Sequence, residues 1–202
     1  MNPKEIIAKG MSASAYHDLL GRIVESGKYK NEEKGSSLYE FIKLNHMRTK
    51  RILKQTKIPT ELFENIKSVR SNYYWVVLSE PWCGDSANIL PIISKLSDMN
   101  DRIELNVLLR DEHPEIMDQF LTNGTRAIPK LICFDEDYSI VGEWGPRPAV
   151  LKERVNCIKN KKSISSDELK EQIQIWYNAD KGNSVYNELG TILQQWFQEV
   201  KV

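Results

Sequence analysis

The sequence predicts an α/β protein: a mixed four-stranded sheet flanked by helices, with helical extensions at both ends. Two observations predict this fold class. Between residues 71 and 160, short aromatic or β-branched runs alternate with stretches of helical apolar spacing. Before and after that range the apolar spacing is helical throughout. We therefore divide the chain into an N-terminal helical extension (1–70) that packs on the core, a central domain (71–160) and a C-terminal helical hairpin (163–202).

The N-terminal extension is predicted to hold three helices. The first spans about 13 to 25, and a Gly-Ser pair separates it from the second. Ser37 and Glu40 predict a capping box at the start of the second helix, because the hydroxyl can accept an N–H of the first turn while the carboxylate reaches back. Pro59 is suited to open the third helix.

The central domain has the element order strand, helix, strand, helix, strand, strand, helix. Strands are predicted at 73–78, 103–109, 130–134 and 138–142, and helices at 84–98, 114–122 and 148–159. This order gives a mixed sheet with helices on both faces. The first strand–helix–strand unit has to cross over right-handed, so its two strands are parallel.

The C-terminal hairpin begins with a second predicted capping box, formed by Ser165 and Glu168. A Gly-Asn pair separates its two helices. Each helix carries an apolar stripe, which includes Trp176 in the first helix and Trp196 in the second. Such a stripe is typical of a helix face packed on its own domain. It is also suited to a second subunit, so a homodimer through the terminal helices stays open.

Charge and cysteine content narrow the classes of function. Lys+Arg and Asp+Glu both number 28, so the net charge is zero, which argues against nucleic acid or an anionic membrane as the main partner. No apolar run approaches the length of a membrane span, and the N-terminus lacks the pattern of a signal peptide. Three scattered cysteines form no disulfide framework, so we expect a cytoplasmic protein.

The most informative segment is Trp82-Cys83-Gly84-Asp85-Ser86, called the cysteine motif below. Cys83 ends a predicted buried strand and opens a helix. The backbone N–H groups of the first turn and the helix dipole would point at its sulfur and favour the thiolate. Since the thiolate is the form that attacks disulfides, the motif predicts a reactive cysteine rather than an inert structural one.

Three motifs, in the same order along the chain, resemble the thioredoxin family. The cysteine motif resembles its Trp-Cys-Gly-Pro-Cys active site. The run Asp111-Glu112-His113-Pro114 is similar to the family's Asp-x-Asn-Pro turn, and residues 124–134 match its Gly-x-Arg-x-Ile-Pro-Thr strand. The resemblance covers about 71–160 and implies a thioredoxin-like fold there. It is closer still to bacterial thioredoxin-family proteins whose motif begins Trp-Cys-Gly-Asp.

The resemblance also implies the surroundings of the reactive cysteine. The Ile128–Pro129 peptide bond would be cis and would present backbone groups beside the sulfur, so a peptide or thiol could lie across the groove. Trp144 and Arg147, in the last site loop, would either shape substrate choice by apolar contact and by anion pairing or simply pack within the loop, and both alternatives stay open. The predicted substrate contacts are Trp82, Gly84, Asp85, Ile128, Pro129 and Trp144.

Three departures from the family pattern change the predicted chemistry. Ser86 stands where a dithiol protein has its resolving cysteine, so it can stabilise the Cys83 thiolate but cannot attack a mixed disulfide. Cys83 and Ser86 are therefore the predicted catalytic residues, and an external thiol must complete the exchange. Asp85 replaces proline, and its negative charge would raise the pKa of Cys83. Val77 occupies the position of the family's buried acid, so we expect no proton relay there.

No second reactive thiol and no metal site is predicted. Cys133 in a strand and Cys157 in a helix are expected to be inert packing positions. His17, His46 and His113 are far apart and have no ligand spacing, so we expect neither a metal nor another cofactor.

The leading hypothesis is monothiol thiol–disulfide exchange through Cys83, with a protein or a low-molecular-weight thiol as partner. The alternative is a redox-silent thioredoxin-fold module that binds a partner through its helical extensions. A third idea rests on the likeness of Cys-Gly-Asp-Ser to the Cys-Gly-Phe-Ser of monothiol glutaredoxins, some of which share an iron–sulfur cluster, but the chain lacks that family's glutathione-binding pattern. The pH dependence of Cys83 alkylation separates the first two hypotheses: a thiolate formed well below the reference pKa of about 8.5 supports exchange, and a normal or raised pKa rules exchange out and leaves the binding module.

Overall fold

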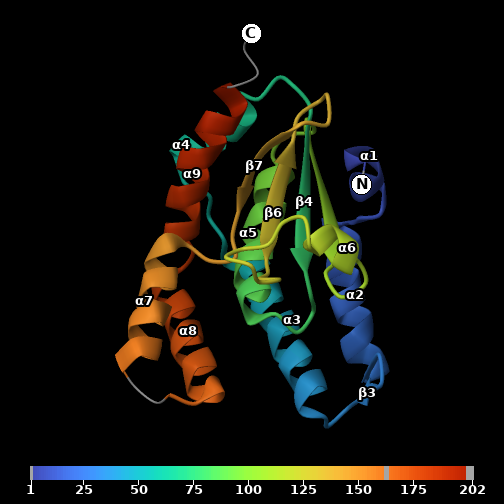
Figure 1. Ribbon diagram of the computed structural model, residues 1–202, viewed down its shortest axis with the longest axis vertical. Coiled ribbons are helices and arrows are strands. Elements are labelled where there is room, and N and C mark those ends of the chain that lie inside the picture. The colour runs from blue at the N-terminus through green and yellow to red at the C-terminus, as the bar shows by residue number, and fades with distance from the viewer. Residues whose placement is uncertain (1, 162–163, 199–202) are drawn as a thin grey trace.

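A five-stranded mixed sheet forms the centre of the computed structural model, which describes residues 2–161 and 164–198 (Figure 1). Strand β4 is central, parallel to β5 on one side and antiparallel to β6 on the other. Strands β1 and β7 are the edges, and each is antiparallel to its neighbour. In sheet order the strands are β1 (Met11–Ser12), β5 (Ile103–Leu109), β4 (Tyr73–Ser79), β6 (Lys130–Phe134) and β7 (Ile140–Trp144).

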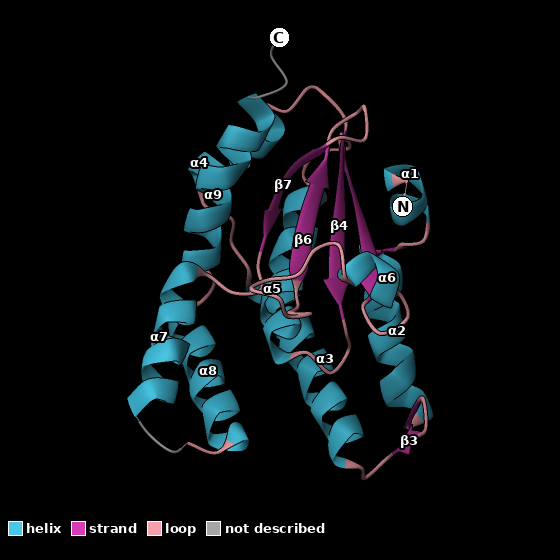
Figure 2. Cartoon of the chain, viewed as in Figure 1, coloured by secondary structure: helices cyan, strands magenta, loops and turns pink. Residues whose placement is uncertain are grey.

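Helices surround this sheet, and a small separate hairpin of β2 (Lys28–Tyr29) and β3 (Glu32–Glu33) follows the second of them (Figure 2). The helices are α1 (Pro3–Ala8), α2 (Ala13–Ser26), α3 (Ser37–Gln55), α4 (Thr60–Lys67), α5 (Gly84–Ser97), α6 (Pro114–Met117), α7 (Ala149–Lys161), α8 (Ser166–Asp180) and α9 (Asn183–Gln198). Residues 163 and 199–202 of the predicted hairpin lie outside the described residues.

The predicted fold class is confirmed. Strands β5 and β6 have the predicted bounds, and β4 and β5 are parallel across the helix α5 that joins them. The sheet nevertheless has one strand more than predicted, because the N-terminal extension contributes β1 beside β5. Two residues are too few to show a period of two, so the sequence carries no pattern that could predict this strand.

Three local expectations are wrong: the helix predicted at 114–122 is only the short α6 (Pro114–Met117), and two other expectations differ by one or two residues. Helix α3 is capped by Ser36, whose hydroxyl accepts the N–H of Tyr39 at 3.2 Å, so Glu40 is not in the position that a capping box needs. Strand β7 begins later than predicted because the Asp135 side chain accepts the N–H groups of Asp137 and Ser139 at 3.0 and 2.8 Å and thereby closes a wider turn. The capping box of Ser165 and Glu168 is present as predicted.

The two faces of the sheet bury separate clusters of apolar side chains. In β4, Trp75 and Val77 face the larger cluster, called the main core, while Val76 and Leu78 face the smaller one, called the second core. The main core lies against α2, α4, α5, α7 and α9, and the second core lies against α1 and α6. Cys83, four residues after the end of β4, also belongs to the second core.

The apolar stripe of α9 packs within its own chain. Leu189, Leu193 and Trp196 belong to the main core, and Trp196 lies directly on Gly142 of β7. A side chain at position 142 would collide with the indole ring, so glycine is required there for packing rather than for backbone conformation.

We expect Gly142→Ala to destabilise the protein by about 1–3 kcal/mol, because the added methyl group has to push the rigid Trp196 ring out of the main core. Urea denaturation measures this difference. Gly190→Ala on α9, the helix that carries Trp196, is the control. A side chain at Gly190 meets nothing within 4 Å, so this change should stabilise the protein by up to about 1 kcal/mol. Equal effects at both positions would contradict the packing argument.

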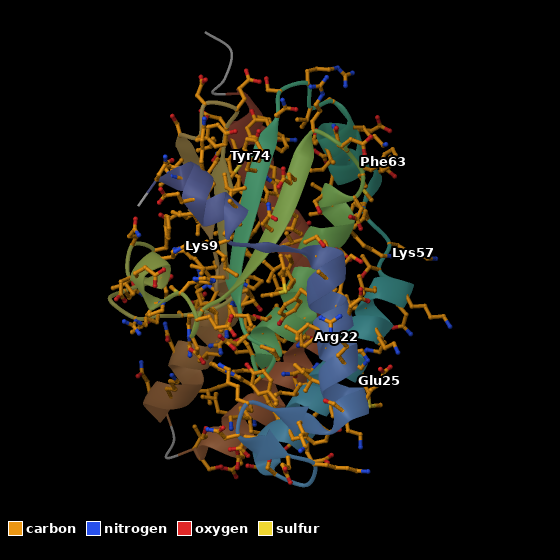
Figure 3. The ribbon with its side chains drawn as sticks, turned by 90° about the vertical axis from the view of Figure 1, so that its right-hand side faces the viewer. Lys9, Arg22, Glu25, Lys57, Phe63 and Tyr74 are labelled. Atoms are coloured by element: carbon orange, nitrogen blue, oxygen red, sulfur yellow. The ribbon has the colours of Figure 1, made fainter. Side chains whose placement is uncertain are left out.

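The outer surface of the extension is charged. Figure 3 shows Arg22 and Glu25 along α2 and Lys57 after α3, and all three are exposed. None of the described helices is both long enough and apolar enough to cross a membrane.

Candidate active site

Cys83 is the N-cap residue of α5, after the short loop that leaves β4. Its carbonyl accepts the N–H of Ala87 at 3.1 Å, and its sulfur accepts the N–H of Ser86 at 3.4 Å. The sulfur thus takes the place that a serine or aspartate oxygen has at other N-caps. The buried Ser86 hydroxyl has no hydrogen-bond partner among the described residues apart from this sulfur, whose pKa it lowers.

The segment before β6 meets the same sulfur atom from the other side. The Ile128–Pro129 peptide bond is cis, and the Ile128 carbonyl accepts a hydrogen bond from the Cys83 thiol at 3.4 Å. This contact needs the protonated thiol, because a thiolate has no hydrogen to donate. Cys83, Ser86, Ile128 and Pro129, which are up to 46 residues apart in sequence, therefore form one site.

Helix α3 lies across the cysteine motif. Buried Asn45 donates to the Pro81 carbonyl at 3.1 Å, just before the motif. Phe41 Cζ and Arg48 Nη1 lie 3.6 and 3.8 Å from the point where a side chain on Gly84 would begin. With this cover in place, Cys83 is only 7% exposed.

Asp85 is held by two residues that are distant in sequence. Arg147, in the loop before α7, donates from Nε to both carboxylate oxygens at 2.9 Å and places Nη2 2.7 Å from Oδ2. The Tyr177 hydroxyl of α8 donates to Oδ1 at 2.9 Å. Asp85, a predicted substrate contact, therefore makes its contacts within the chain in this structure. The anion that pairs with Arg147 is the Asp85 carboxylate.

These surroundings raise the pKa of the Cys83 thiol to about 11. Burial is the largest cause, and the negative charge of Asp85 is the next, while the Ser86 hydroxyl and backbone N–H groups act in the opposite direction. A raised pKa is the direction that favours the binding module over exchange. In the covered site, the thiol is the dominant form at neutral pH.

Comparison with known families decides the assignment. The thioredoxin family model matches residues 33–170, which is more than half of the chain. This chain belongs to the thioredoxin family. The match extends into α3 and α8, the two helices that contact the cysteine motif, so it is wider than the sequence motifs indicate.

Solved structures agree on the thioredoxin fold. An HIV epitope-scaffold protein superimposes with a TM-score of 0.62 at 16% identity, over 95% of this chain and 96% of the other. A protein of unknown function from Pseudomonas aeruginosa gives a TM-score of 0.50 at 21% identity, over 71% of this chain and 90% of the other. No curated protein matches the sequence. At these identities the likenesses show the fold alone.

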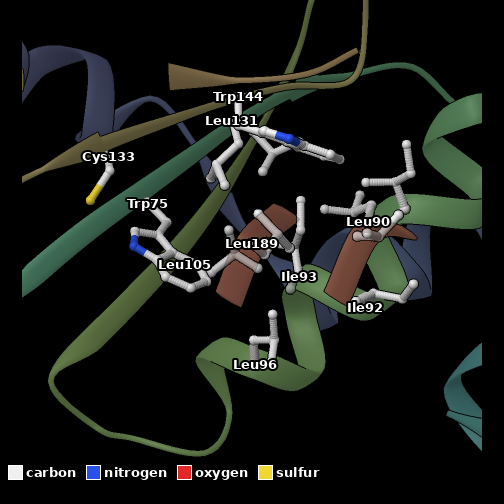
Figure 4. Packing of buried hydrophobic residues seen from close by; sticks show 14 of the residues in the cluster. Trp75, Leu90, Ile92, Ile93, Leu96, Leu105, Leu131, Cys133, Trp144 and Leu189 are labelled. Atoms are coloured by element: carbon white, nitrogen blue, oxygen red, sulfur yellow. The ribbon is translucent and has the colours of Figure 1, made fainter. Parts of the chain in front are cut away.

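The two tryptophans of this thioredoxin site have different environments. Trp82 is half-buried, and the Arg110 guanidinium lies over its ring at 4.7 Å. Trp144 was expected to contact substrate, but the structure places it in the main core, with its indole N–H donated to Glu188 of α9 at 2.8 Å (Figure 4). An indole held from α9 cannot at the same time face the groove, so Trp144 is a packing residue here.

A buried acid lies near the motif, although not where thioredoxins usually have it. Val77 is apolar and buried in the main core, as the sequence indicates. Glu80, three residues later and 0% exposed, accepts from the Tyr29 hydroxyl at 3.0 Å and from the Asp111 N–H at 2.7 Å. Burial is the largest cause that raises the pKa of Glu80. Sequence reasoning missed this residue because the family pattern directs attention to position 77.

The other cysteines are not placed to resolve a disulfide at Cys83. Cys133 is fully buried in the main core, on the opposite face of the sheet from Cys83, and burial raises its pKa. Cys157 is exposed on α7. Among the described residues, no group of three or more His, Cys, Asp or Glu side chains is placed to hold a metal ion.

We expect Cys83 to be alkylated slowly at pH 7 and about tenfold faster per pH unit as the pH rises, with the rate still increasing at about pH 10, because its pKa is about 11. Iodoacetamide labelling of a Cys157→Ser variant, followed by peptide mass spectrometry, measures the rate. The double variant lacking Cys83 as well reports any labelling of Cys133. A plateau reached below about pH 8.5 would contradict the prediction.

Proposed function

We propose that this thioredoxin-family protein performs thiol–disulfide exchange through Cys83 alone. The Cys83 thiolate attacks a disulfide, forms a mixed disulfide with one half and releases the other half as a thiolate. A thiolate from an external thiol then attacks the substrate sulfur of the mixed disulfide. This second step forms a new disulfide between substrate and external thiol and returns the Cys83 thiolate, so atoms and electrons balance.

One observation carries the proposal: a single sulfur is placed between the first turn of α5 and the carbonyl before Pro129. The Ser86 N–H at 3.4 Å and the otherwise unpartnered Ser86 hydroxyl are preorganised to stabilise a thiolate or a departing sulfur. Backbone groups beside Pro129 are suited to hold an extended peptide or thiol across the site. With Ser86 in the resolving position, the chain supplies no second thiol there.

The proposed exchange requires the cover to move. With Cys83 only 7% exposed, a disulfide reaches the sulfur only if neighbouring residues move, and we propose that Phe41 and Arg48 of α3, which lie against Gly84, are the ones that shift. Uncovering the sulfur would also remove the largest cause of its raised pKa. We propose Trp82, Gly84, Ile128 and Pro129 as the substrate contacts, a protein or low-molecular-weight thiol as partner, and the cytoplasm of a bacterium as the setting.

A redox-silent binding module is the second candidate. The burial of Cys83 and its raised pKa favour it, because both oppose thiolate formation in the covered state. In this case, Cys83 is a capping residue of α5, and the helical extensions provide the partner surface.

A turnover assay separates the two candidates. We expect reduction of hydroxyethyl disulfide to require both Cys83 and added glutathione, with glutathione reductase reporting each cycle, and to rise with pH. Cys83→Ser should fall to the uncatalysed rate, while Cys157→Ser should keep full activity because Cys157 lies on α7, away from the motif. Phe41→Ala should raise the rate by thinning the cover. A folded wild-type protein with no Cys83-dependent turnover or mixed disulfide up to about pH 10 would leave the binding module.

A further inference from the structure

The C-terminal hairpin reaches the cysteine motif through one carboxylate. Asp85 is the second residue of α5, two positions after Cys83, and its side chain is 11% exposed. Its Oδ1 accepts from the Tyr177 hydroxyl at 2.9 Å, and both oxygens contact the Arg147 guanidinium between 2.7 and 2.9 Å. Three donor atoms from two separate elements are thus directed at one carboxylate.

This carboxylate is an obstacle to the proposed chemistry. A negative charge beside the sulfur opposes formation of a second negative charge, and Asp85 is the main charged group that acts on Cys83 in this direction. A bidentate guanidinium contact compensates such a charge better than a single ammonium, because two parallel N–H groups hold the carboxylate in one orientation. Arg147 is also close enough for its own charge to interact with a Cys83 thiolate.

Helix α8 packs on the main core through Tyr177, with Leu169, Ile173 and Trp176 partly buried against it, and polar contacts also join it to α5. Tyr177 is its buried residue. One turn earlier, Gln174 exchanges hydrogen bonds with Asn88 of α5 at 3.0 and 3.3 Å. Asn178 accepts from Arg51 of α3 at 2.9 Å. Apolar packing and polar contacts together therefore hold α8 beside α5, where Tyr177 reaches Asp85.

We propose that Arg147 and Tyr177 are positioning residues that partly neutralise and orient the Asp85 carboxylate, so that this carboxylate opposes thiolate formation at Cys83 less than an unpaired carboxylate would. The inference rests on the proposed exchange function, because there the thiolate is the reacting form. It gives α8 a role in the reactivity of the site. The charged and titratable groups that face the motif are Asp85 on α5, Tyr16 on α2, Arg48 on α3, Arg110 after β5, Arg147 before α7 and Tyr177 on α8.

The test is the rate of Cys83 alkylation at a fixed pH of about 8.5, in the Cys157→Ser background, where the rate is proportional to the thiolate fraction. We expect Arg147→Gln to lower the rate at least about tenfold and Tyr177→Phe about two- to threefold, since phenylalanine keeps the packing and removes the hydroxyl. Arg147→Lys should lie between wild type and Arg147→Gln. Asp85→Asn should raise the rate at least about tenfold.

Adding Arg147→Gln to Asp85→Asn separates action through Asp85 from direct action on the sulfur. We expect a further loss of only about two- to threefold in the double variant, because the charge to be neutralised is then absent and only the direct interaction of Arg147 with the thiolate remains. An equal tenfold loss in both backgrounds would overturn the proposal. Circular dichroism verifies folding, and Tyr177→Phe and Arg147→Lys keep the test valid if Arg147→Gln does not fold.

A mere cover would behave differently. If Arg147 and Tyr177 only hold α8 over the sulfur, their replacement would raise the alkylation rate, and more for a bulky maleimide than for iodoacetamide. Such a result overturns the proposal. Alkylation needs no disulfide partner, so a shifted rate with no turnover would contradict the exchange function while the effect of the two positioning residues on Cys83 would stand.

Discussion

Replacing Ser86 by cysteine should convert the site from one that needs an external thiol to one that releases its own mixed disulfide. The Ser86 side chain is buried beside the Cys83 sulfur and has no other partner, and its backbone N–H already contacts that sulfur at 3.4 Å. A thiol at this position would attack the mixed disulfide as an intramolecular nucleophile, form a disulfide with Cys83 and expel the substrate thiolate.

We expect release from a preformed mixed disulfide, without added thiol, to be at least about a hundredfold faster in Ser86→Cys than in wild type, because the attacking group is held in place. Intact mass spectrometry measures it, since the product has lost the substrate thiol and is two hydrogens lighter than the reduced protein. Ser86→Ala is the matched control: it should remain dependent on external thiol and should be alkylated more slowly, because the hydroxyl that lowers the pKa of Cys83 is gone. If Ser86→Cys still needs external thiol, the two positions are too far apart in the working protein and the proposed geometry is wrong.

The parts of this molecule that the sequence could predict are those with local signals. Strands β5 and β6 are mostly apolar runs of ordinary strand length, and their bounds are as predicted. Cys83 and Pro129 are recognisable because each belongs to a motif of adjacent residues. Such signals are independent of how distant helices pack, so they hold before any tertiary structure is known.

The parts that could not be predicted depend on contacts between distant elements. Tyr177 meets Asp85 across 92 positions of sequence, and no spacing rule tells which face of α8 turns toward the motif. Trp144 is similar: whether its indole faces the groove or the core is decided by Glu188, 44 residues later. Phe41 and Arg48 share one face of α3, a pattern visible in the sequence, but the surface that this face covers is not.

Glu80 is expected to be the charged residue whose loss costs the most stability, because it joins the N-terminal extension to the motif from a fully buried position. Its two oxygens accept from Tyr29 of β2 and from the Asp111 N–H after β5. Glu80→Ala leaves both donors without a partner and creates a cavity, so we expect a loss of about 2–5 kcal/mol in the free energy of unfolding. Tyr29→Phe removes one of the two bonds and should cost about 1–2 kcal/mol.

Unlike Glu80→Ala, Glu80→Gln should gain stability relative to wild type, and this gain should depend on pH with a definite sign. The folded protein raises the pKa of Glu80 above its unfolded value, so the favourable contribution of protonated Glu80 is present at low pH and is lost as the pH rises through the folded pKa. Glutamine carries no charge to desolvate, and the Tyr29 hydroxyl can accept from its amide. Urea denaturation from about pH 4 to about pH 8 should therefore show Glu80→Gln gaining stability relative to wild type as the pH rises. The opposite result would be a wild-type free energy of unfolding that increases relative to that of Glu80→Gln as the pH rises. It would mean that Tyr29, Asp111 and the nearby Lys30 charge stabilise the carboxylate more than burial opposes it.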